Sequence, residues 1–91
     1  VLNPEVFSLS QNWPNPFNPS TTISFNLPEA SEVVLKVYDI TGREVATLAD
    51  GSFAKGSHKI SFDAYNLTSG IYFYRIQAGS FVETKRAVLL K

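Results

Sequence analysis

The chain has 91 residues, 44% of them hydrophobic and 18% charged, and its eight basic and eight acidic side chains cancel to a formal net charge of zero. This length fits one domain, and the absence of cysteine excludes disulfides and thiolate metal sites. The balanced charge argues against nucleic-acid binding, which needs a concentrated basic surface, and no apolar run approaches the roughly 20 residues of a membrane-spanning helix.

Residues 6–9 could add a short strand near the start of the chain, and a corner rich in proline and asparagine follows them. Residues 14–19 contain three prolines, each of which removes a backbone donor and favours an extended conformation in the residue before it. We therefore expect a stiff corner that leads into the next strand, with Trp13 and Phe17 packed inward. One of the bonds before proline could be cis.

Apolar and polar residues alternate after the corner, which predicts a series of strands and no long helix. Residues 45–48 and 81–90 add two further runs, so that about seven strands are expected. A register slip of one residue would bury Lys36 and Arg75, and the alternation therefore fixes the register. The residues expected to share a core between two sheets are Ile23, Phe25, Val33, Leu35, Val37, Ile60, Phe62, Tyr72, Tyr74 and Ile76.

Turns containing glycine separate these strands at short intervals. Residues 39–42 have Asp at the first and Gly at the fourth position of a type I turn. The Asp39 carboxylate can accept the N–H groups of this turn, and Gly42 can adopt the positive φ of a following bulge. Strands of this composition and spacing predict an antiparallel β-sandwich.

The residues that could carry chemistry have simpler structural roles. His58 is the only histidine and shares a strand face with apolar residues, so we expect a core or edge position rather than a general base. Asp39, Asp50 and Asp63 stand at strand ends, where capping of turns explains them. No nucleophile elbow or catalytic triad is recognisable, and we expect neither an enzyme nor a metal ion or cofactor.

Aromatic residues leave a carbohydrate-binding module as an alternative, because the flat rings of Trp13, Tyr65, Tyr72 and Tyr74 could stack on sugars. A domain of this size needs its aromatic rings for burial, and the Tyr72 hydroxyl could bond the backbone across a corner. Residues 66–68 fit the glycosylation sequon, as many chance triplets do. The residues alone indicate a binding, structural or carrier module.

Four motifs follow one another along the chain, at Asn15–Ile23 (NPFNPSTTI), Val37–Val45 (VYDITGREV), Gly70–Arg75 (GIYFYR) and Lys85–Lys91 (KRAVLLK). Together they resemble the C-terminal sorting domain of type IX secretion cargo proteins of the Bacteroidetes and related bacteria. The resemblance extends from about residue 12 to residue 91, and the part from 35 to 79 is also similar to the immunoglobulin-like domain of flagellar hook-capping proteins.

The resemblance implies a single immunoglobulin-like sorting domain over residues 1–91, with a lead-in and corner at 1–20 and the sandwich core at 21–91. Such a domain is a non-catalytic address for a cargo attached at its N-terminal side. It directs the cargo from the periplasm through an outer-membrane translocon to the cell surface or medium. A sortase-like protease then commonly removes the domain and joins the cargo to an anionic lipopolysaccharide. We expect a monomer without cofactor, and we expect that the chain is not a full-length precursor.

Recognition by the secretion machinery is then expected on the last strand, where charge can steer the encounter and the backbone edge can pair with a receptor. The expected recognition residues are Lys85, Arg86, Val88, Leu89, Leu90 and Lys91, although Leu90 could also lie in the core. The motif residues expected to secure the fold are Asn15, Pro16, Phe17, Asn18, Pro19, Asp39, Gly42, Arg43, Gly70 and Tyr72. The alternatives are a carbohydrate-binding or surface-stalk accessory with an exposed row of aromatic residues, and an assembly module that self-associates.

Overall fold

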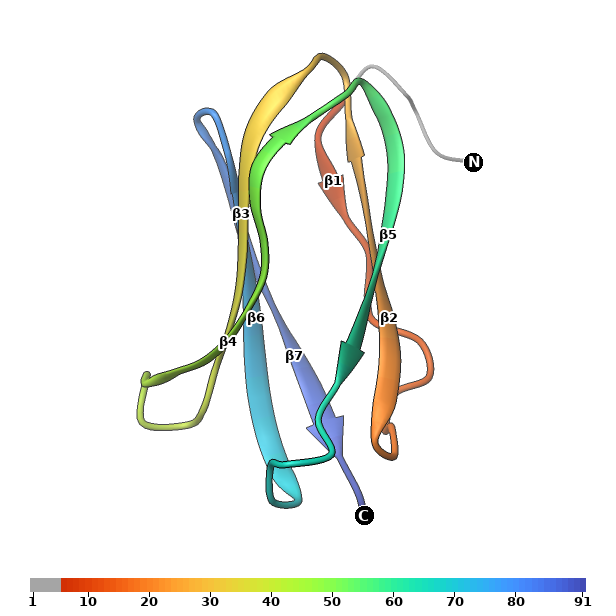
Figure 1. The fold of residues 1–91 in the computed structure, drawn as a ribbon, viewed down its shortest axis with the longest axis vertical. Helices are drawn as coiled ribbons and strands as arrows, with labels where there is room; N and C mark the ends of the chain where they lie inside the picture. Colours follow the sequence, from red (N-terminus) through yellow and green to blue (C-terminus); the bar gives the residue numbers. More distant parts are fainter. Residues whose placement is uncertain (1–5) are drawn as a thin grey trace.

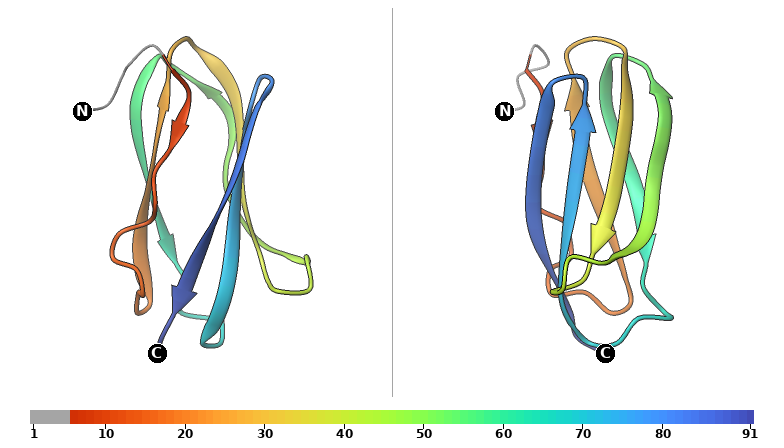
Figure 2. Two further views of the ribbon diagram at one scale, coloured as in Figure 1. Left: turned by 180° about the vertical axis from the view of Figure 1, so that it is seen from behind. Right: turned by 90° about the vertical axis from the view of Figure 1, so that its left-hand side faces the viewer.

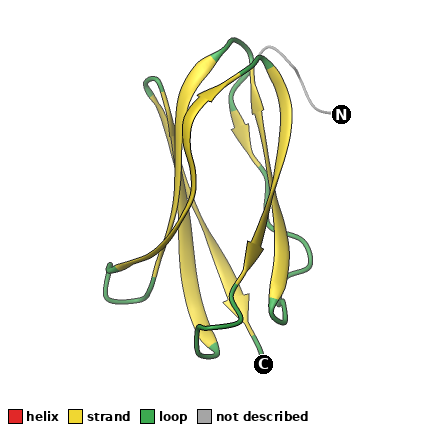
Figure 3. Ribbon diagram, in the orientation of Figure 1, coloured by secondary structure: helices red, strands yellow, loops and turns green. Residues whose placement is uncertain are grey.

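The computed structural model describes residues 6–91, which form two antiparallel β-sheets packed face to face (Figure 1). These residues contain strands and loops only (Figure 3). The strands are β1 (Ser8–Leu9), β2 (Ser20–Leu27), β3 (Ser31–Tyr38), β4 (Glu44–Phe53), β5 (Gly56–Asp63), β6 (Gly70–Ala78) and β7 (Phe81–Leu89). The prediction of an all-β, immunoglobulin-like sandwich of about seven strands is confirmed.

The strand order makes the last strand an edge strand. One sheet has the order β1-β2-β5 and the other the order β4-β3-β6-β7. The chain crosses between the sheets after β2, β4 and β5. In the four-stranded sheet, β7 pairs only with β6 and lies at the side of the sandwich (Figure 2).

The core lies between the sheets and uses alternate residues of the strands. Of the ten residues expected there, nine are buried and Ile60 is partly buried. Lys36 and Arg75 lie opposite each other in β3 and β6, on the face turned away from the core, as the alternation predicted. The other buried apolar residues are Leu9, Phe17, Leu27, Ala49, Ala64, Ala78, Ala87 and Leu89. Burial of a large aliphatic or aromatic side chain contributes about 1.5–3 kcal/mol, which makes this core the main source of stability.

One expected inward position, that of Trp13, is wrong, and Leu90 does not take the core position that was left open for it. Trp13 is 77% exposed, because its backbone pairs with Thr22 in both directions at 3.0 Å and so lies along β2 rather than beneath it. Leu90 is 56% exposed, because it follows the buried Leu89 and successive side chains of an extended chain point to opposite faces. Phe17 does pack inward and contacts the ring of Phe62, with a centroid distance of 5.8 Å.

The bonds before Pro14, Pro16 and Pro19 are all cis, where the sequence suggested that one could be. His58 lies at an edge of the core, as expected, with its ring 5.3 Å from that of Phe25 and 5.2 Å from that of Phe53.

The turn between β3 and β4 has the predicted geometry. The Gly42 N–H donates to the Asp39 carbonyl at 3.0 Å, and the Asp39 carboxylate accepts the N–H groups of Thr41 at 2.9 Å and Arg43 at 3.1 Å. Bonds from the Thr41 hydroxyl and these two N–H groups hold the pKa of Asp39 below its usual range. The backbone φ of Gly42 is +86°.

The Gly42→Val variant should lower the free energy of unfolding by more than about 1 kcal/mol, because a β-branched residue is strained at this φ. No atom lies within 4 Å of the Cβ that a substitution would add, so backbone strain alone causes the loss. Gly42→Asn is the matched control and should lose less, since Asn tolerates the left-handed region. Urea denaturation measures both, and an unchanged stability of the Val variant would contradict this assignment of the turn.

Candidate recognition site on the terminal strand

Strand β7 places the expected recognition residues on two opposite faces, because side chains alternate along a strand. Ala87 and Leu89 point into the core and are 3% and 0% exposed. Arg86, Val88 and Leu90 lie on the outer face of the sheet, where Arg86 and Leu90 are exposed and Val88 is half-buried. Leu89 is therefore inaccessible to a receptor that binds the folded domain, and its role in the structure is to fill the core.

Lys85 and Arg86 are neighbours in sequence but differ in their surroundings. The Lys85 ammonium forms an ion pair with Glu83, which is on the same face, with an Nζ–Oε2 distance of 3.1 Å. Arg86 lies on the opposite face beside Phe73 of β6 and has no carboxylate within 4.0 Å in the part of the chain that the structure describes. Of these two residues, Arg86 is the one that adds an unpaired positive charge to the outer face.

Lys91 is bound to the loop between β5 and β6. Its backbone N–H donates to the Ser69 hydroxyl at 2.9 Å, and its ammonium donates to the Tyr65 carbonyl at 2.6 Å. These two bonds hold the residues after β7 against the end of the sandwich.

Residues 11–17, which we call the strap, lie between β2, where Trp13 pairs with Thr22, and the outer edge of β7. An edge strand turns alternate N–H and C=O groups away from its sheet, where they can pair with another chain. Phe17 of the strap takes two of these groups. Its N–H donates to the Val88 carbonyl at 2.9 Å, and its carbonyl accepts the Leu90 N–H at 3.0 Å.

Two side chains of the strap occupy the neighbouring edge groups. The Asn15 amide oxygen accepts the Val88 N–H at 3.0 Å, and the Gln11 amide donates to the Arg86 carbonyl at 2.7 Å. Together with Phe17, they bind every outward backbone group from the Arg86 carbonyl to the Leu90 N–H. This half of the edge is not available for pairing with a receptor strand. The expected pairing of the last strand with a receptor sheet is therefore blocked from Arg86 to Leu90.

Tyr74 of β6 anchors the beginning of the strap from inside the sandwich. Its hydroxyl donates to the Ser10 carbonyl at 2.7 Å and accepts the Asn12 N–H at 2.8 Å. Burial raises the pKa of Tyr74 to about 12. The buried Asn12 side chain donates in turn to the Thr21 hydroxyl at 3.1 Å and the Pro14 carbonyl at 3.2 Å. The roles of Gln11 and Asn12 could not be predicted locally, because their bonds to Arg86, Tyr74 and Thr21 join residues that are distant in the sequence.

The motif residues of the corner have unequal roles. Asn15 and Phe17 bind β7, and the Pro19 carbonyl accepts the Ala64 N–H at 2.8 Å. Pro16 is exposed, and so is Asn18, whose side chain makes no hydrogen bond within residues 6–91.

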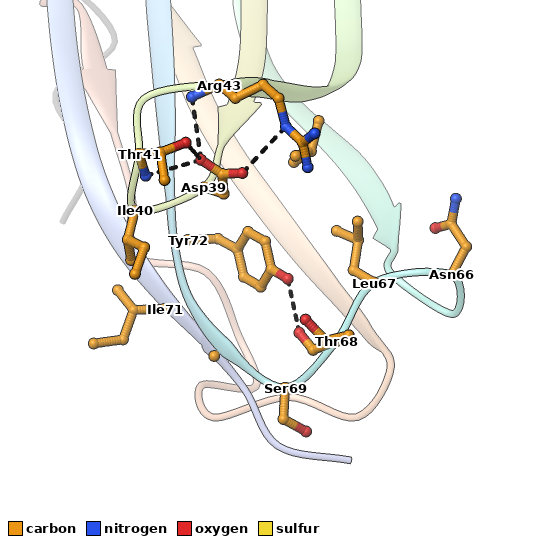
Figure 4. A pocket seen from close by; sticks show the side chains of 12 residues that line it. Asp39, Ile40, Thr41, Arg43, Asn66, Leu67, Thr68, Ser69, Ile71 and Tyr72 are labelled. Carbon is orange, nitrogen blue, oxygen red and sulfur yellow. Dashed lines mark hydrogen bonds and ion pairs between the residues drawn. The ribbon is translucent and has the colours of Figure 1, made fainter.

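A cavity of about 370 Å³ lies where the β3–β4 turn faces the loop before β6 (Figure 4). Tyr72 lies in its wall and donates its hydroxyl to the Thr68 carbonyl at 2.7 Å, as the sequence predicted for a corner. Gly70, at the start of β6, and Arg43 also line this cavity. Arg43 was expected to secure the fold. Its side chain is 78% exposed, and its Nε atom lies 3.3 Å from the Asp39 carboxylate.

Other kinds of site find little support in the described residues. The large aromatic side chains exposed there are Trp13 in the strap and Tyr65 in the β5–β6 loop, which do not make a row. Within residues 6–91, no group of three or more His, Cys, Asp or Glu side chains could hold a metal ion. The same residues include no helix long and apolar enough to cross a membrane.

Comparison with known families gives one match. A family model described as the secretion system C-terminal sorting domain matches residues 11–90, which is most of the chain. The match includes the strap, both sheets and the outer face of β7. Among curated proteins, none matches the chain in sequence.

The Asn15→Ala variant should make the Val88 amide exchange its hydrogen with solvent about fivefold faster, because the amide loses the acceptor that it has in the structure. A net contribution of about 1 kcal/mol is typical of such a bond, and the local opening equilibrium changes accordingly. Asn18→Ala is the matched control and should leave the exchange unchanged. Equal exchange of Val88 in the two variants, measured by NMR, would contradict the role of the strap.

The stability of the protein should fall between pH 10 and pH 12, because the unfolded chain ionises Tyr74 near its ordinary pKa of 10.0 whereas the folded chain keeps the proton up to about 12. The unfolded state then binds fewer protons, and the free energy of unfolding decreases as the pH rises. Tyr74→Phe should reduce this alkaline loss, because it removes the phenol that the folded chain keeps protonated. Urea denaturation at several pH values tests this, and an identical alkaline loss in the wild type and Tyr74→Phe would refute it.

Proposed function

We propose a recognition mechanism for this chain, which belongs to the family of secretion system C-terminal sorting domains. A domain of this family is a sorting signal, not known as catalytic, that directs a cargo protein on its N-terminal side through the type IX secretion system to the cell surface or medium. We further propose that the chain acts only as a signal. The single His58 supports this, since its ring nitrogen bonds the Ala54 carbonyl at 2.7 Å and its ring stacks on Phe25.

In this mechanism, the secretion machinery binds side chains on the outer face of β7 rather than the backbone groups of its edge. The observation that carries the proposal is the strap, which occupies the backbone edge from Arg86 to Leu90. Side chains of the outer face remain accessible, and they combine one unpaired cation, Arg86, with Val88 and the exposed Leu90. Arginine beside apolar groups is typical of the residues that dominate protein interfaces.

The other expected recognition residues act indirectly. Leu89 holds β7 on the core, Lys91 holds the end of the chain on the β5–β6 loop, and Lys85 belongs to the opposite face. All three orient the outer face without contacting a receptor. We propose that the corner and the sandwich form one domain, as expected for residues 1–91, and the bonds of the strap to both sheets support this.

The partners in this mechanism are a receptor of the outer-membrane translocon and a sortase-like protease that removes the domain. A protease acting on the folded domain would cut before Ser8, since β1 pairs with Asn26 and Phe25 of β2 and is protected from there on. We propose a monomer, because a signal of this kind presents the same face on every cargo.

Export of a reporter tests the mechanism. The 91-residue chain is fused behind a reporter with a periplasmic export signal in a type IX-competent host related to its source. Arg86→Glu should reduce the exported reporter by about tenfold, because truncation or reversal of an interface arginine costs more than about 1 kcal/mol. Lys85→Glu is the matched control, an equal change of charge one residue away on the opposite face, and should be exported normally.

Circular dichroism and thermal unfolding must show that both variants remain folded. Equal loss of export in the two folded variants would mean that export depends on the net charge of the domain and not on the outer face of β7. Retention of the unmodified fusion in the periplasm would overturn the sorting function for this chain.

A further inference from the structure

Exposed aliphatic side chains gather at one end of the outer face of the four-stranded sheet. Ile40 in the β3–β4 turn is 74% exposed, Ile71 of β6 is 40% exposed and Leu90 is 56% exposed. Ile40 and Ile71 line the same cavity (Figure 4), and Ile71 lies opposite Val88 of β7. We call Ile40, Ile71, Val88 and Leu90 the aliphatic patch.

The fold does not explain the aliphatic patch. The second position of a type I turn accepts most residues, yet Ile40 places a large aliphatic side chain there in water. Single exposed apolar residues are ordinary, whereas contiguous ones on a small monomeric protein mark an interaction surface. Three motifs that are separate in the sequence contribute to this one surface, at residues 37–45, 70–75 and 85–91.

Three arginine residues lie near the aliphatic patch, one in the cavity and two further along the same face of the sheet. Arg43 lines the cavity with a side chain that is 78% exposed. Arg86 is in register with Phe73, one row along the sheet from the Ile71–Val88 pair, and Arg75 follows on the same face. Arg75 and Arg86 have no carboxylate within 4.0 Å in the described residues, and the single ion pair of Arg43 is with Asp39. The surface is therefore positive as well as apolar.

We propose that the aliphatic patch and its arginines dock an acidic protein segment whose own aliphatic side chains enter the cavity beside Ile40. This inference rests on the proposed function and identifies the occupant as a component of the secretion machinery. Charge complementarity supports an acidic partner, since Arg75 and Arg86 would gain carboxylates that the chain itself does not supply.

The cavity favours a protein segment over a membrane. Its volume of about 370 Å³ is within the range of sites that enclose a ligand or side chains. The walls also include the neutral polar residues Asn66, Thr68 and Ser69, which can bond a peptide backbone. A lipid surface would instead be contacted by a convex apolar face with aromatic residues at its border.

Binding of the fluorescently labelled 91-residue chain to the purified, detergent-solubilised type IX outer-membrane translocon tests the inference. Ile40→Asp should weaken binding about tenfold, as loss of a central interface residue does, and its place in an exposed turn leaves the core intact. The matched control is Val82→Asp, which changes an exposed aliphatic residue near the other end of β7 and should leave binding unchanged. Arg43→Gln should weaken binding and reduce its dependence on salt.

The outcomes separate the two proposals. If the unmodified chain binds and Ile40→Asp binds equally well, the docking site is refuted and the sorting function stands. If the unmodified chain does not bind the translocon, the proposed recognition mechanism is refuted together with the docking site. If Ile40→Asp instead abolishes binding to vesicles of phosphatidylcholine and phosphatidylglycerol without affecting the translocon, the surface is a membrane contact and the inference is wrong.

Discussion

Occupation of the β7 edge by the strap is the constraint on which the other features of the molecule depend. An open edge strand can pair with any exposed strand it meets, which is a hazard for a domain that is exported together with a cargo protein. Phe17 and Asn15 take both backbone groups of Val88. Because Tyr74 fixes the start of the strap at Ser10 and Asn12, the same segment also closes that side of the sandwich. The last strand can then present its outer face while its edge is inert.

The uncovered half of the edge is protected in another way. No segment among residues 6–91 pairs with the outward backbone groups of Val82 and Thr84. The adjacent Glu83 and Lys85 point toward the inner face of the sheet and pair with each other. Charged residues directed inward on an edge strand oppose the addition of a further strand, since the added strand would have to desolvate them. This gives Lys85 a physical role that differs from that of Arg86.

The sequence predicted the features that depend on neighbouring residues. Alternation identified the core, and the Asp39 turn and the Tyr72 corner follow from contacts within four residues. The strap could not be predicted from the sequence, because Asn15 bonds Val88, 73 residues away, and Tyr74 bonds Asn12, 62 residues away. The separation of Lys85 from Arg86 was predictable, since the same alternation that places Leu89 in the core turns Arg86 outward. Residues 85–91 were interpreted as one basic and apolar cluster, and this interpretation overlooked that Lys85 and Arg86 lie on opposite faces.

The strand order explains why the aliphatic patch, which we propose as the docking surface, lies at one end of the sandwich. β3, β6 and β7 are neighbours in an antiparallel sheet, so the end of β3, the start of β6 and the end of β7 meet. The chain enters the fold at the opposite end, where Phe7 stacks on Phe81 at the start of β7 with a centroid distance of 5.3 Å (Figure 1). Nine residues of extended strand separate Phe81 from Leu90, a length of about 30 Å. The first residues that the structure describes therefore lie far from Ile40, Ile71 and Leu90, which favours access of a receptor to this surface while a cargo is attached on the N-terminal side.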